Sequence, residues 1–448
     1  MGCGGSKNKN SVDLTTLQRF SAPTNVPPER LSVLLPKTGP LGQTNYWNRL
    51  SLSKQPHEVE LTKSRFSLKY AFTSLRGFYP DALQKSNQDE VCANQLFGEN
   101  LEQLLFAVFD GHGSEGHLCA QFAKNKLTDN LLSDKTFKHD PQQGLRSALV
   151  LLNKQLHSSR IDDSMSGTTA IVGLIRDRTL YVANVGDSRA VLALQGPDGI
   201  IARPLSNDQT PFRADERARV RTEGAEVLTM RQMETGEGET DGFTSEEEQG
   251  GDPPRLWAPG ASWPGTAFTR SIGDSVAEAI GVCAEPEIET VDLVPAHRFL
   301  VLASDGVFEF MSNDDVVQLV LAHPDPQSAA VALVSAAYSK WLDYEQRTDD
   351  ISCVIIQFHG LEHSVPNPPA VPDLQSGART TSFNSSEDQP LQQKNMPRSS
   401  SSASLNAILS KEVTRKDSRR DVSKSPSGKH VLSTVPSIDS ASLTAVGT

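Results

Sequence analysis

Cysteine is scarce in this chain, and its pattern excludes the common cysteine-built sites. The 448 residues include five cysteines, with no close pair among them. They are Cys3, Cys92, Cys119, Cys283 and Cys353. An odd number without a repeated spacing excludes a zinc ribbon and fits a protein of a reducing compartment.

Long hydrophobic runs and an excess of positive charge are also missing. No segment approaches the roughly 18 consecutive apolar residues that indicate a membrane-spanning helix, and the N-terminus lacks the apolar core of a secretory signal. The net charge of −12 argues against general nucleic-acid binding, which requires a basic surface. Apolar residues make up only 37% of the chain, so we expect part of it to lie outside any packed core.

Changes in composition mark one central domain. Prolines without hydrophobic periodicity predict an irregular N-terminal tether over residues 1–63. Residues 64–360 have the pattern of a packed domain, with an acidic flap at about residues 232–254. That flap is either a solvated loop or an element that repels acidic substrates or recruits a basic partner. Residues 361–448 are rich in serine and proline, and we expect a disordered tail there.

The first residues match a lipidation pattern. Gly2 and Ser6 fit N-myristoylation, and Cys3 is a candidate palmitoylation site. One myristoyl chain gives only marginal membrane binding, so the second acyl group matters. We therefore expect a lipid-anchored protein at the cytoplasmic face of a membrane, in the cytoplasm, or both. The alternative is a flexible, glycine-rich terminus with a fortuitous match.

Apolar runs predict both strands and helices in the central domain. The predicted strands cover residues 104–109, 168–175, 179–184, 188–194, 298–304 and 351–358. Helices are predicted over residues 114–133 and after Asp140-Pro141 and Asp325-Pro326, where an N-cap precedes proline. Tight turns between strands indicate antiparallel pairing. We expect an α+β fold, a four-layer αββα sandwich with two central, mainly antiparallel sheets flanked by helices.

The most informative stretch is Phe106–Gly113, where an apolar strand leads into an aspartate, a glycine and a histidine. Four aspartates occur in comparable settings, and they are Asp89, Asp110, Asp305 and Asp349. Unpaired carboxylates gathered at one place would repel one another, and divalent cations would relieve that repulsion. Ligands that are all oxygen favour Mg²⁺ or Mn²⁺ over zinc. Taken singly, each aspartate is explained as a turn or capping residue, and His112 as a hydrogen-bonded structural imidazole.

Six short motifs follow one another in the central domain. They are Asp110–Gly113, Ser166–Ala170, Val182–Arg189, Thr269–Asp274, Ser304–Gly306 and Thr348–Ser352. In this order they resemble the metal-dependent serine/threonine protein phosphatases of type 2C. The similarity covers about residues 66–359, and Pro264–Arg270 is most like plant and algal members. The resemblance implies phosphorylated proteins as partners and hydrolysis of phosphoserine and phosphothreonine as the reaction.

The resemblance also implies a site for two Mg²⁺ or Mn²⁺ ions. Asp89 and Asp110 would bridge the ions, with the Gly111 carbonyl on one of them. Asp305 and Asp349 would complete the shell of the second ion. A water held between the ions would attack phosphorus in line, without a phosphoenzyme.

Further roles follow from the same resemblance. His112 would be the general acid that protonates the departing serine or threonine oxygen. Asp187 and Glu309 would hold a weaker third ion, although many relatives have aspartate where this chain has Glu309. Read without the resemblance, Asp187 is also explained by a simple hairpin turn. Asp274 would have a structural role beside the site.

One departure from the family pattern concerns phosphate binding. Many relatives have an arginine five residues before the first metal-binding aspartate, where this chain has Gln84 followed by Lys85. Lysine acts as a point charge and cannot form the two parallel contacts of arginine. Lys85 or Arg76 is the candidate replacement, and we expect weaker phosphate binding and a raised KM.

Other functions remain open at this point. A catalytically weak or dead relative would bind phosphoproteins as a scaffold, but such proteins usually lose metal aspartates. A metal phosphodiesterase that acts on small molecules would need different motifs. Trp257 and Trp263 lie near the position of a tryptophan found in hormone-responsive plant relatives, but neither has the matching motif. Nothing in the sequence indicates a stable oligomer, so we expect a monomer.

Overall fold

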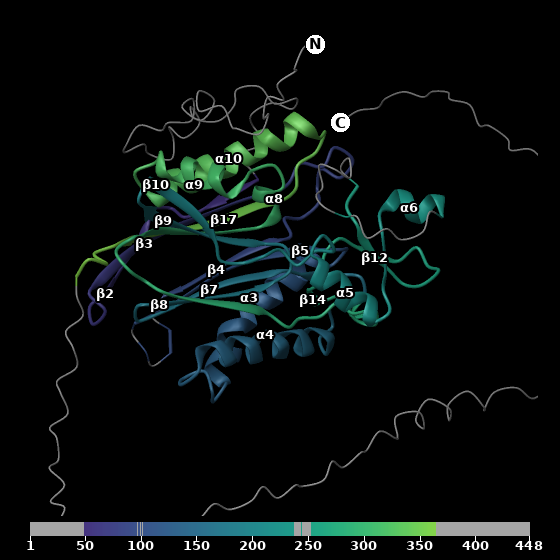
Figure 1. Ribbon diagram of the computed structural model, residues 1–448, viewed down its shortest axis with the longest axis horizontal. Helices are drawn as coiled ribbons and strands as arrows, with labels where there is room; N and C mark the ends of the chain where they lie inside the picture. Colours follow the sequence, from purple (N-terminus) through teal and green to yellow (C-terminus); the bar gives the residue numbers. More distant parts are fainter. Residues whose placement is uncertain are drawn as a thin grey trace, which may run out of the picture. The chain divides into compact units, whose positions relative to one another are not determined.

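The computed structural model describes residues 49–363, apart from positions 96, 99, 101, 237–242 and 244–251. Strands dominate this part of the chain (Figure 1). In chain order they are β1 (Leu50–Leu52), β2 (His57–Leu61), β3 (Phe66–Leu75), β4 (Asp89–Gln95), β5 (Gln103–His112), β6 (Gly167–Thr168), β7 (Ala170–Arg176), β8 (Thr179–Val185), β9 (Arg189–Gly196), β10 (Gly199–Pro204), β11 (Glu226–Leu228), β12 (Arg255–Trp257), β13 (Pro264–Thr266), β14 (Ile272–Gly273), β15 (Glu287–Asp292), β16 (His297–Ala303) and β17 (Ile351–His359).

Two of the described helices, those starting at Pro141 and Pro326, begin at the predicted Asp-Pro capping signals. The described helices are α3 (Gly116–Ser133), α4 (Pro141–His157), α5 (Ala214–Thr222), α6 (Met230–Thr235), α7 (Ser275–Glu278), α8 (Asp305–Phe308), α9 (Asn313–Leu321) and α10 (Pro326–Tyr344). The Asp140 carboxylate accepts from the Gln143 N–H, and Asp325 accepts from the N–H groups of Gln327 and Ser328. These bonds satisfy backbone donors that the first helical turn leaves without a partner.

Two antiparallel sheets form the centre of the domain. One has the order β1-β3-β17-β16-β9-β10 with β2 also on β3, and the other has the order β14-β6-β5-β7-β8-β15 with β4 also on β5. Helices α9 and α10 cover the outer face of the first sheet, and α3 and α4 cover that of the second (Figure 1). The predicted α+β fold, a four-layer αββα sandwich, is confirmed.

Alternation of side chains along the strands produces these layers, because successive residues of a strand point to opposite faces. In β16, Phe299 and Val301 pack with α9 and α10, whereas Leu300 and Leu302 pack against the other sheet. Phe106 of β5 joins the layer between the sheets. This packed layer fixes the distance between the two sheets. Side chains at the ends of strands from both sheets can therefore meet in one place.

The N-terminal boundary of the domain differs from the prediction. β1 and β2 lie within residues 1–63, where we expected an irregular tether, and both pair with β3. In β2, Val59 and Leu61 are buried between exposed residues and join the layer between the sheets. That alternation over a few residues was the available signal, and the surrounding prolines obscured it. Residues 1–48 lie outside the described part of the chain.

A separate three-stranded sheet, β11-β12-β13, borders the predicted flap. Val227 and Leu256 of this sheet pack with Phe243 and with Val220 of α5. Most of the acidic segment 232–254 lies outside the described residues, as does the predicted tail from residue 364 onward. Among the helices described, none has the length and apolar character needed to cross a membrane.

Candidate active site

Asp89 and Asp110 lie side by side on neighbouring strands. The register of β4 and β5 places them directly opposite each other, so both side chains lie on one face of the sheet. Asp89 is only 5% exposed. One of its oxygens accepts a hydrogen bond from Ser304 Oγ at 2.9 Å, and the other has no hydrogen-bond partner within the described residues. A buried carboxylate oxygen without a partner is costly unless a cation or another donor is supplied.

Asp305 and Asp349 reach the same place from the other sheet. Asp305 begins α8 directly after β16, and Asp349 precedes β17, which is the neighbour of β16. Asp305 lies close enough to Asp110 to help raise the pKa of the Asp110 carboxyl group. Asp349 interacts electrostatically with the other three aspartates. The structure thus brings all four predicted aspartates, which we call the aspartate cluster, to one end of the two sheets.

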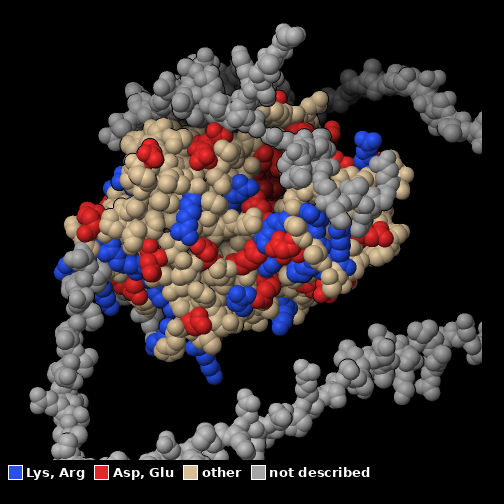
Figure 2. Space-filling view, viewed as in Figure 1, with Lys and Arg blue, Asp and Glu red and all other residues tan. Residues whose placement is uncertain are grey.

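Burial and mutual repulsion make Asp89, Asp110 and Asp305 difficult to ionise. Burial, followed by the neighbouring carboxylates, holds the pKa values of Asp89 and Asp110 well above their usual range. Burial and the nearby Asp349 raise the pKa of Asp305 to about 6. Figure 2 shows acidic atoms within a recess of the molecular surface. The site therefore contains more negative charge than the surrounding side chains neutralise.

Asp350 is a residue whose importance the sequence did not reveal. Its Oδ1 accepts from the Gly77 N–H at 2.6 Å, and its Oδ2 accepts from the Gln88 N–H at 2.8 Å. It therefore holds the segment that leads into Asp89. Burial raises its pKa to about 6. The signal was the pair of adjacent aspartates, but sequence alone does not say which one points toward the cluster.

Gly111 and the end of β5 correct one detail of the prediction. β5 continues through His112, which pairs with Gly167, so Asp110 lies within the strand and not at its end. A Cβ on Gly111 would lie 2.3 Å from the Gly116 carbonyl oxygen and 2.6 Å from that of Gln88. Only glycine allows this close approach of three backbone segments.

His112 lies beside the aspartate cluster and is held by Asp274. Its Nε2 is 2.6 Å from Asp274 Oδ2, which also accepts from Ser271 Oγ at 2.6 Å. The ring centre lies 4.4 Å from that of Phe268. Burial by itself would lower the pKa of His112, but the Asp274 carboxylate outweighs burial and raises it. The protonated form of the imidazole is therefore favoured. Asp274 lies beside the site, in contact with His112, as we expected.

The predicted third-ion residues do not lie in comparable environments. Burial, Asp305 and Asp208 raise the pKa of Asp187 to about 8. Asp208, which the sequence did not single out because it looks like a turn residue, is also paired with Arg189. Glu309 is exposed at the C-terminal end of α8. Asp208 is thus the unpredicted carboxylate on this side of the cluster.

The two candidate phosphate-binding cations are placed differently. Lys85 Nζ lies 3.9 Å from the centre of the Tyr79 ring, and the Tyr79 hydroxyl donates to Asp349 Oδ1 at 2.5 Å. Arg76 follows β3 and exchanges backbone hydrogen bonds with the backbone and side chain of Arg49. Lys85 is therefore linked to the aspartate cluster through Tyr79. The candidate lipidation residues, Gly2 and Cys3, lie outside the described residues.

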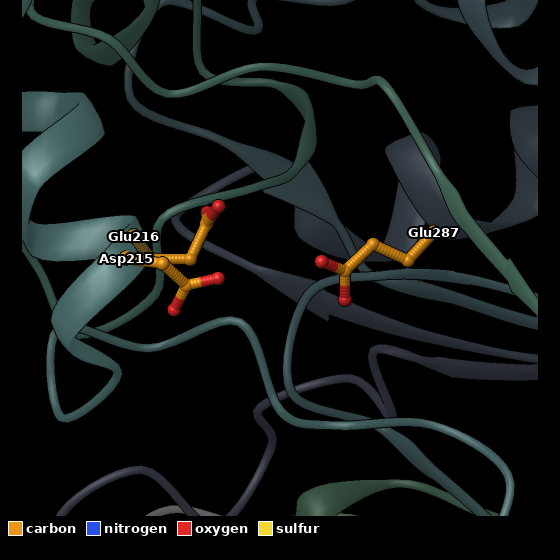
Figure 3. Close-up of side chains that lie close together, drawn as sticks. All are labelled: Asp215, Glu216 and Glu287. Atoms are coloured by element: carbon orange, nitrogen blue, oxygen red, sulfur yellow. The ribbon is translucent and has the colours of Figure 1, made fainter.

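A second acidic group lies on α5 and β15. Asp215 and Glu216 come from one helix and point toward Glu287 on the facing strand (Figure 3). Each supplies one oxygen within 4.8 Å of the others, and within the described ranges no other trio of possible ligands does so. No three members of the aspartate cluster meet this distance, so they are more widely spaced than the ligands of one compact site.

Arginines neutralise this second group, which we call the ion-pair network. Arg213 pairs with Asp215 and Glu287, while Arg219 and Arg270 pair with Glu216. Hydrogen bonds from Arg213 lower the pKa values of its two partners. Burial would raise the pKa of Glu216, but its arginine partners hold it well below the usual range. Protein side chains already supply the counter-charge, so we assign the network a structural role.

Comparison with known proteins identifies the family. The model of the family described as Protein phosphatase 2C matches residues 73–341. Probable protein phosphatase 2C 35 of Arabidopsis thaliana is 46% identical over 306 residues, which cover 68% of this chain and 88% of the relative. Probable protein phosphatase 2C 12 of Oryza sativa subsp. japonica is 30% identical over 322 residues, covering 61% of this chain and 78% of the relative.

A solved structure supports the fold. The crystal structure of serine-threonine phosphatase 2C from Toxoplasma gondii matches with a TM-score of 0.56 and 17% identity, over 69% of this chain and 99% of that chain. The family match spans Asp89, Asp110, His112 and Asp305, and Asp349 follows a few residues beyond it. This chain belongs to the protein phosphatase 2C family, as a member of plant type, and is a metal-dependent serine/threonine protein phosphatase.

Proposed function

We propose that the enzyme hydrolyses phosphoserine and phosphothreonine in proteins with a pair of divalent cations held by the aspartate cluster. The convergence of four carboxylates from both sheets on one buried place carries this proposal. Raised pKa values and an unpartnered oxygen on Asp89 fit a group that brings positive charge. The oxygen-only donor set favours Mg²⁺ or Mn²⁺. The number of ions, two, is what the resemblance to the family implies.

The cations and the protein side chains have separate tasks. Bound divalent cations would make a water molecule more acidic and neutralise the phosphoryl oxygens. The protein fixes the ligands: Ser304 orients Asp89, and Asp350 holds the segment leading into that aspartate. Gly111 allows the backbone beside Asp110 to pack closely. These contacts keep repelling carboxylates together, so little rearrangement is needed when substrate arrives.

His112 is the proposed general acid. The serine or threonine oxygen leaves as a strong base and needs a proton, which a positioned imidazolium supplies. Asp274 engages Nε2 and raises the pKa of the ring, so Nδ1 is the atom proposed to donate to the leaving oxygen. This division of labour between a carboxylate that orients and an imidazole that transfers the proton follows the logic of catalytic histidine–aspartate pairs.

Lys85 is the proposed contact for the substrate phosphate. Its ammonium group lies on the ring of Tyr79, whose hydroxyl contacts Asp349, and a single positive charge there can attract a phosphate dianion. Because a lysine makes a point contact, we expect a higher KM than an arginine would give. Lys85→Arg should therefore lower the KM for a phosphopeptide.

Membrane attachment is a separate part of the proposal and rests on the sequence. Myristate on Gly2 and palmitate on Cys3 would together hold the enzyme at a membrane surface, near membrane-associated phosphoproteins. Mass spectrometry of the native N-terminus tests this directly. An unmodified Gly2 would contradict it, and Gly2→Ala should release the protein from membranes in fractionated cells.

The catalytic proposal is tested by Mn²⁺-dependent hydrolysis of a phosphoserine peptide. Asp110→Asn should abolish hydrolysis, whereas Asp129→Asn on the exposed surface of α3 should not. If wild-type protein binds the phosphopeptide but does not hydrolyse it with Mn²⁺ or Mg²⁺, the scaffold alternative is correct and the catalytic proposal is wrong.

A further inference from the structure

The loop between β3 and β4 is fixed against the segment that carries Asp349. The Asp350 carboxylate accepts from the Gly77 and Gln88 N–H groups, which lie at the two ends of this loop. Phe78 and Thr348 form an antiparallel bridge, with the Thr348 N–H donating to the Phe78 carbonyl at 2.9 Å. The loop therefore has a defined position relative to the aspartate cluster.

The packing within this loop leaves no room for a side chain at Gly77. A Cβ added to Gly77 would lie 2.6 Å from Tyr79 Cε2, 2.8 Å from the Asp349 carbonyl carbon and 2.8 Å from the Thr348 carbonyl oxygen. Glycine at this position lets the Tyr79 ring lie against the backbone of the metal-binding segment. The Tyr79 ring therefore lies close to both Asp349 and Lys85.

The hydroxyl of Tyr79 contacts a proposed metal ligand. It donates to Asp349 Oδ1 at 2.5 Å. A phenolic hydroxyl keeps its proton near neutral pH, so it remains a donor to this carboxylate. A hydrogen bond of this kind fixes the orientation of a carboxylate and leaves its other oxygen for a cation.

The ring face of Tyr79 contacts the proposed phosphate-binding residue. Lys85 Nζ lies 3.9 Å from the ring centre, within the range of a cation–π interaction. Holding a flexible lysine side chain at one place costs conformational entropy, and the contact with the ring offsets part of that cost.

We propose that Tyr79 is a positioning residue that orients the Asp349 carboxylate through its hydroxyl and holds the Lys85 ammonium through its ring. The inference rests on the proposed function, since it assigns a task to the metal ligand and to the phosphate contact of that site. It explains how a lysine on a loop can replace a phosphate-binding arginine. The hydroxyl and the ring have different tasks, and conservative variants can separate them.

Calorimetric Mn²⁺ binding and phosphopeptide kinetics test the two tasks separately. Tyr79→Phe should weaken Mn²⁺ binding roughly 10-fold and leave KM unchanged, because it removes only the hydroxyl. Tyr79→Leu should weaken Mn²⁺ binding to the same extent and also raise KM about 10-fold, because the cation–π platform is gone. Lys85→Gln should raise KM by a similar factor and leave Mn²⁺ affinity unchanged.

Matched controls and opposite outcomes make the test decisive. Tyr181→Phe on β8 and Lys154→Gln on α4 remove the same groups elsewhere and should change neither quantity. Unchanged Mn²⁺ affinity in Tyr79→Phe, or unchanged KM in Tyr79→Leu, overturns the inference while wild-type protein still binds Mn²⁺ and hydrolyses the peptide. Wild-type protein that binds no Mn²⁺ and hydrolyses nothing overturns the proposed function itself, and with it this inference.

Discussion

Two groups of carboxylates in this domain differ in the counter-charges that surround them. In the ion-pair network, Arg213, Arg219 and Arg270 lie against the acidic side chains and lower their pKa values. In the aspartate cluster, carboxylates lie mainly against one another, and burial raises the pKa values of Asp110 and Asp305.

The difference shows how an acidic cluster is to be interpreted. If metal sites were assigned only from short distances between carboxylate oxygens, the ion-pair network would be chosen. Its carboxylates are, however, already neutralised by arginines. If metal sites are assigned from buried carboxylates without a neutralising partner, the aspartate cluster is chosen, and its positive charge must come from a bound ion. The second criterion agrees with the family assignment, and the first does not. Substitutions in the ion-pair network should therefore lower stability and leave metal binding unchanged. Substitutions in the aspartate cluster should weaken metal binding.

The largest effect on stability is expected at the centre of the ion-pair network. Glu216→Gln leaves Arg219 and Arg270 without their shared carboxylate in a largely buried place. We expect the free energy of unfolding to fall by about 3 kcal/mol, as for a broken buried ion pair. Urea unfolding measures this, with exposed Glu234→Gln as the control. A change as small as that of the control would show that the network is not a stabilising element.

The next effect concerns the acid beside the aspartate cluster. Asp274→Asn keeps the shape and tolerates the left-handed backbone at this position, where φ is 55°, but removes the charge that favours protonated His112. The rate on a phosphoserine peptide should fall about 100-fold. The rate on p-nitrophenyl phosphate should change little, because its leaving group needs no proton. Equal losses on both substrates would argue against general-acid catalysis by His112.

The two groups should also give opposite dependences of stability on pH. Carboxyls with raised pKa values stabilise the metal-free protein at pH values below their ordinary pKa, and this stabilisation is lost as the pH rises through about 6 for Asp305 and Asp350 and about 8 for Asp187. Glu216, with its lowered pKa, contributes stability above its ordinary pKa that is lost as the pH falls.

Thermal unfolding in EDTA should therefore show a melting temperature that falls between about pH 5 and pH 8. Mn²⁺ should restore the loss, and Asp305→Asn should flatten the decline. A metal-free melting temperature that rises steadily over this range would contradict the assignment of uncompensated charge to the aspartate cluster.

The smallest effect is expected at an exposed ion pair. Arg203 and Glu289 lie 2.7 Å apart, but both side chains are more than 40% exposed. Arg203→Gln should lower the free energy of unfolding by no more than about 0.5 kcal/mol. A loss comparable to that of Glu216→Gln would show that burial does not control the value of ion pairs in this protein.

Sequence reasoning reached the fold because its signals are local. The apolar runs of β5 and β16 and the Asp-Pro caps of α4 and α10 depend only on neighbouring residues. The short strands β1 and β2 were missed because prolines flank them and their burial depends on β3. Tertiary context decides such strands more than intrinsic preference does.

The site was predicted less evenly. Asp110, Asp305 and Asp349 were found within the ordered motifs and Asp89 outside them, and the structure brings all four together. Their roles as ligands remain a prediction. Tyr79, Asp350 and Asp208 were missed because each acts through a contact between segments far apart in the chain. Spacing in sequence does not report such contacts.

The most direct test of uncompensated charge in the aspartate cluster is proton release when Mn²⁺ binds. Calorimetric titrations of metal-free protein at pH 6, in buffers with different ionisation enthalpies, measure the protons released. Because the pKa values of Asp110 and Asp305 are raised, we expect a bound cation to displace about one or more protons per protein. Asp110→Asn should reduce both the release and the affinity. Binding without proton release, or binding unaffected by that substitution, would contradict the assignment.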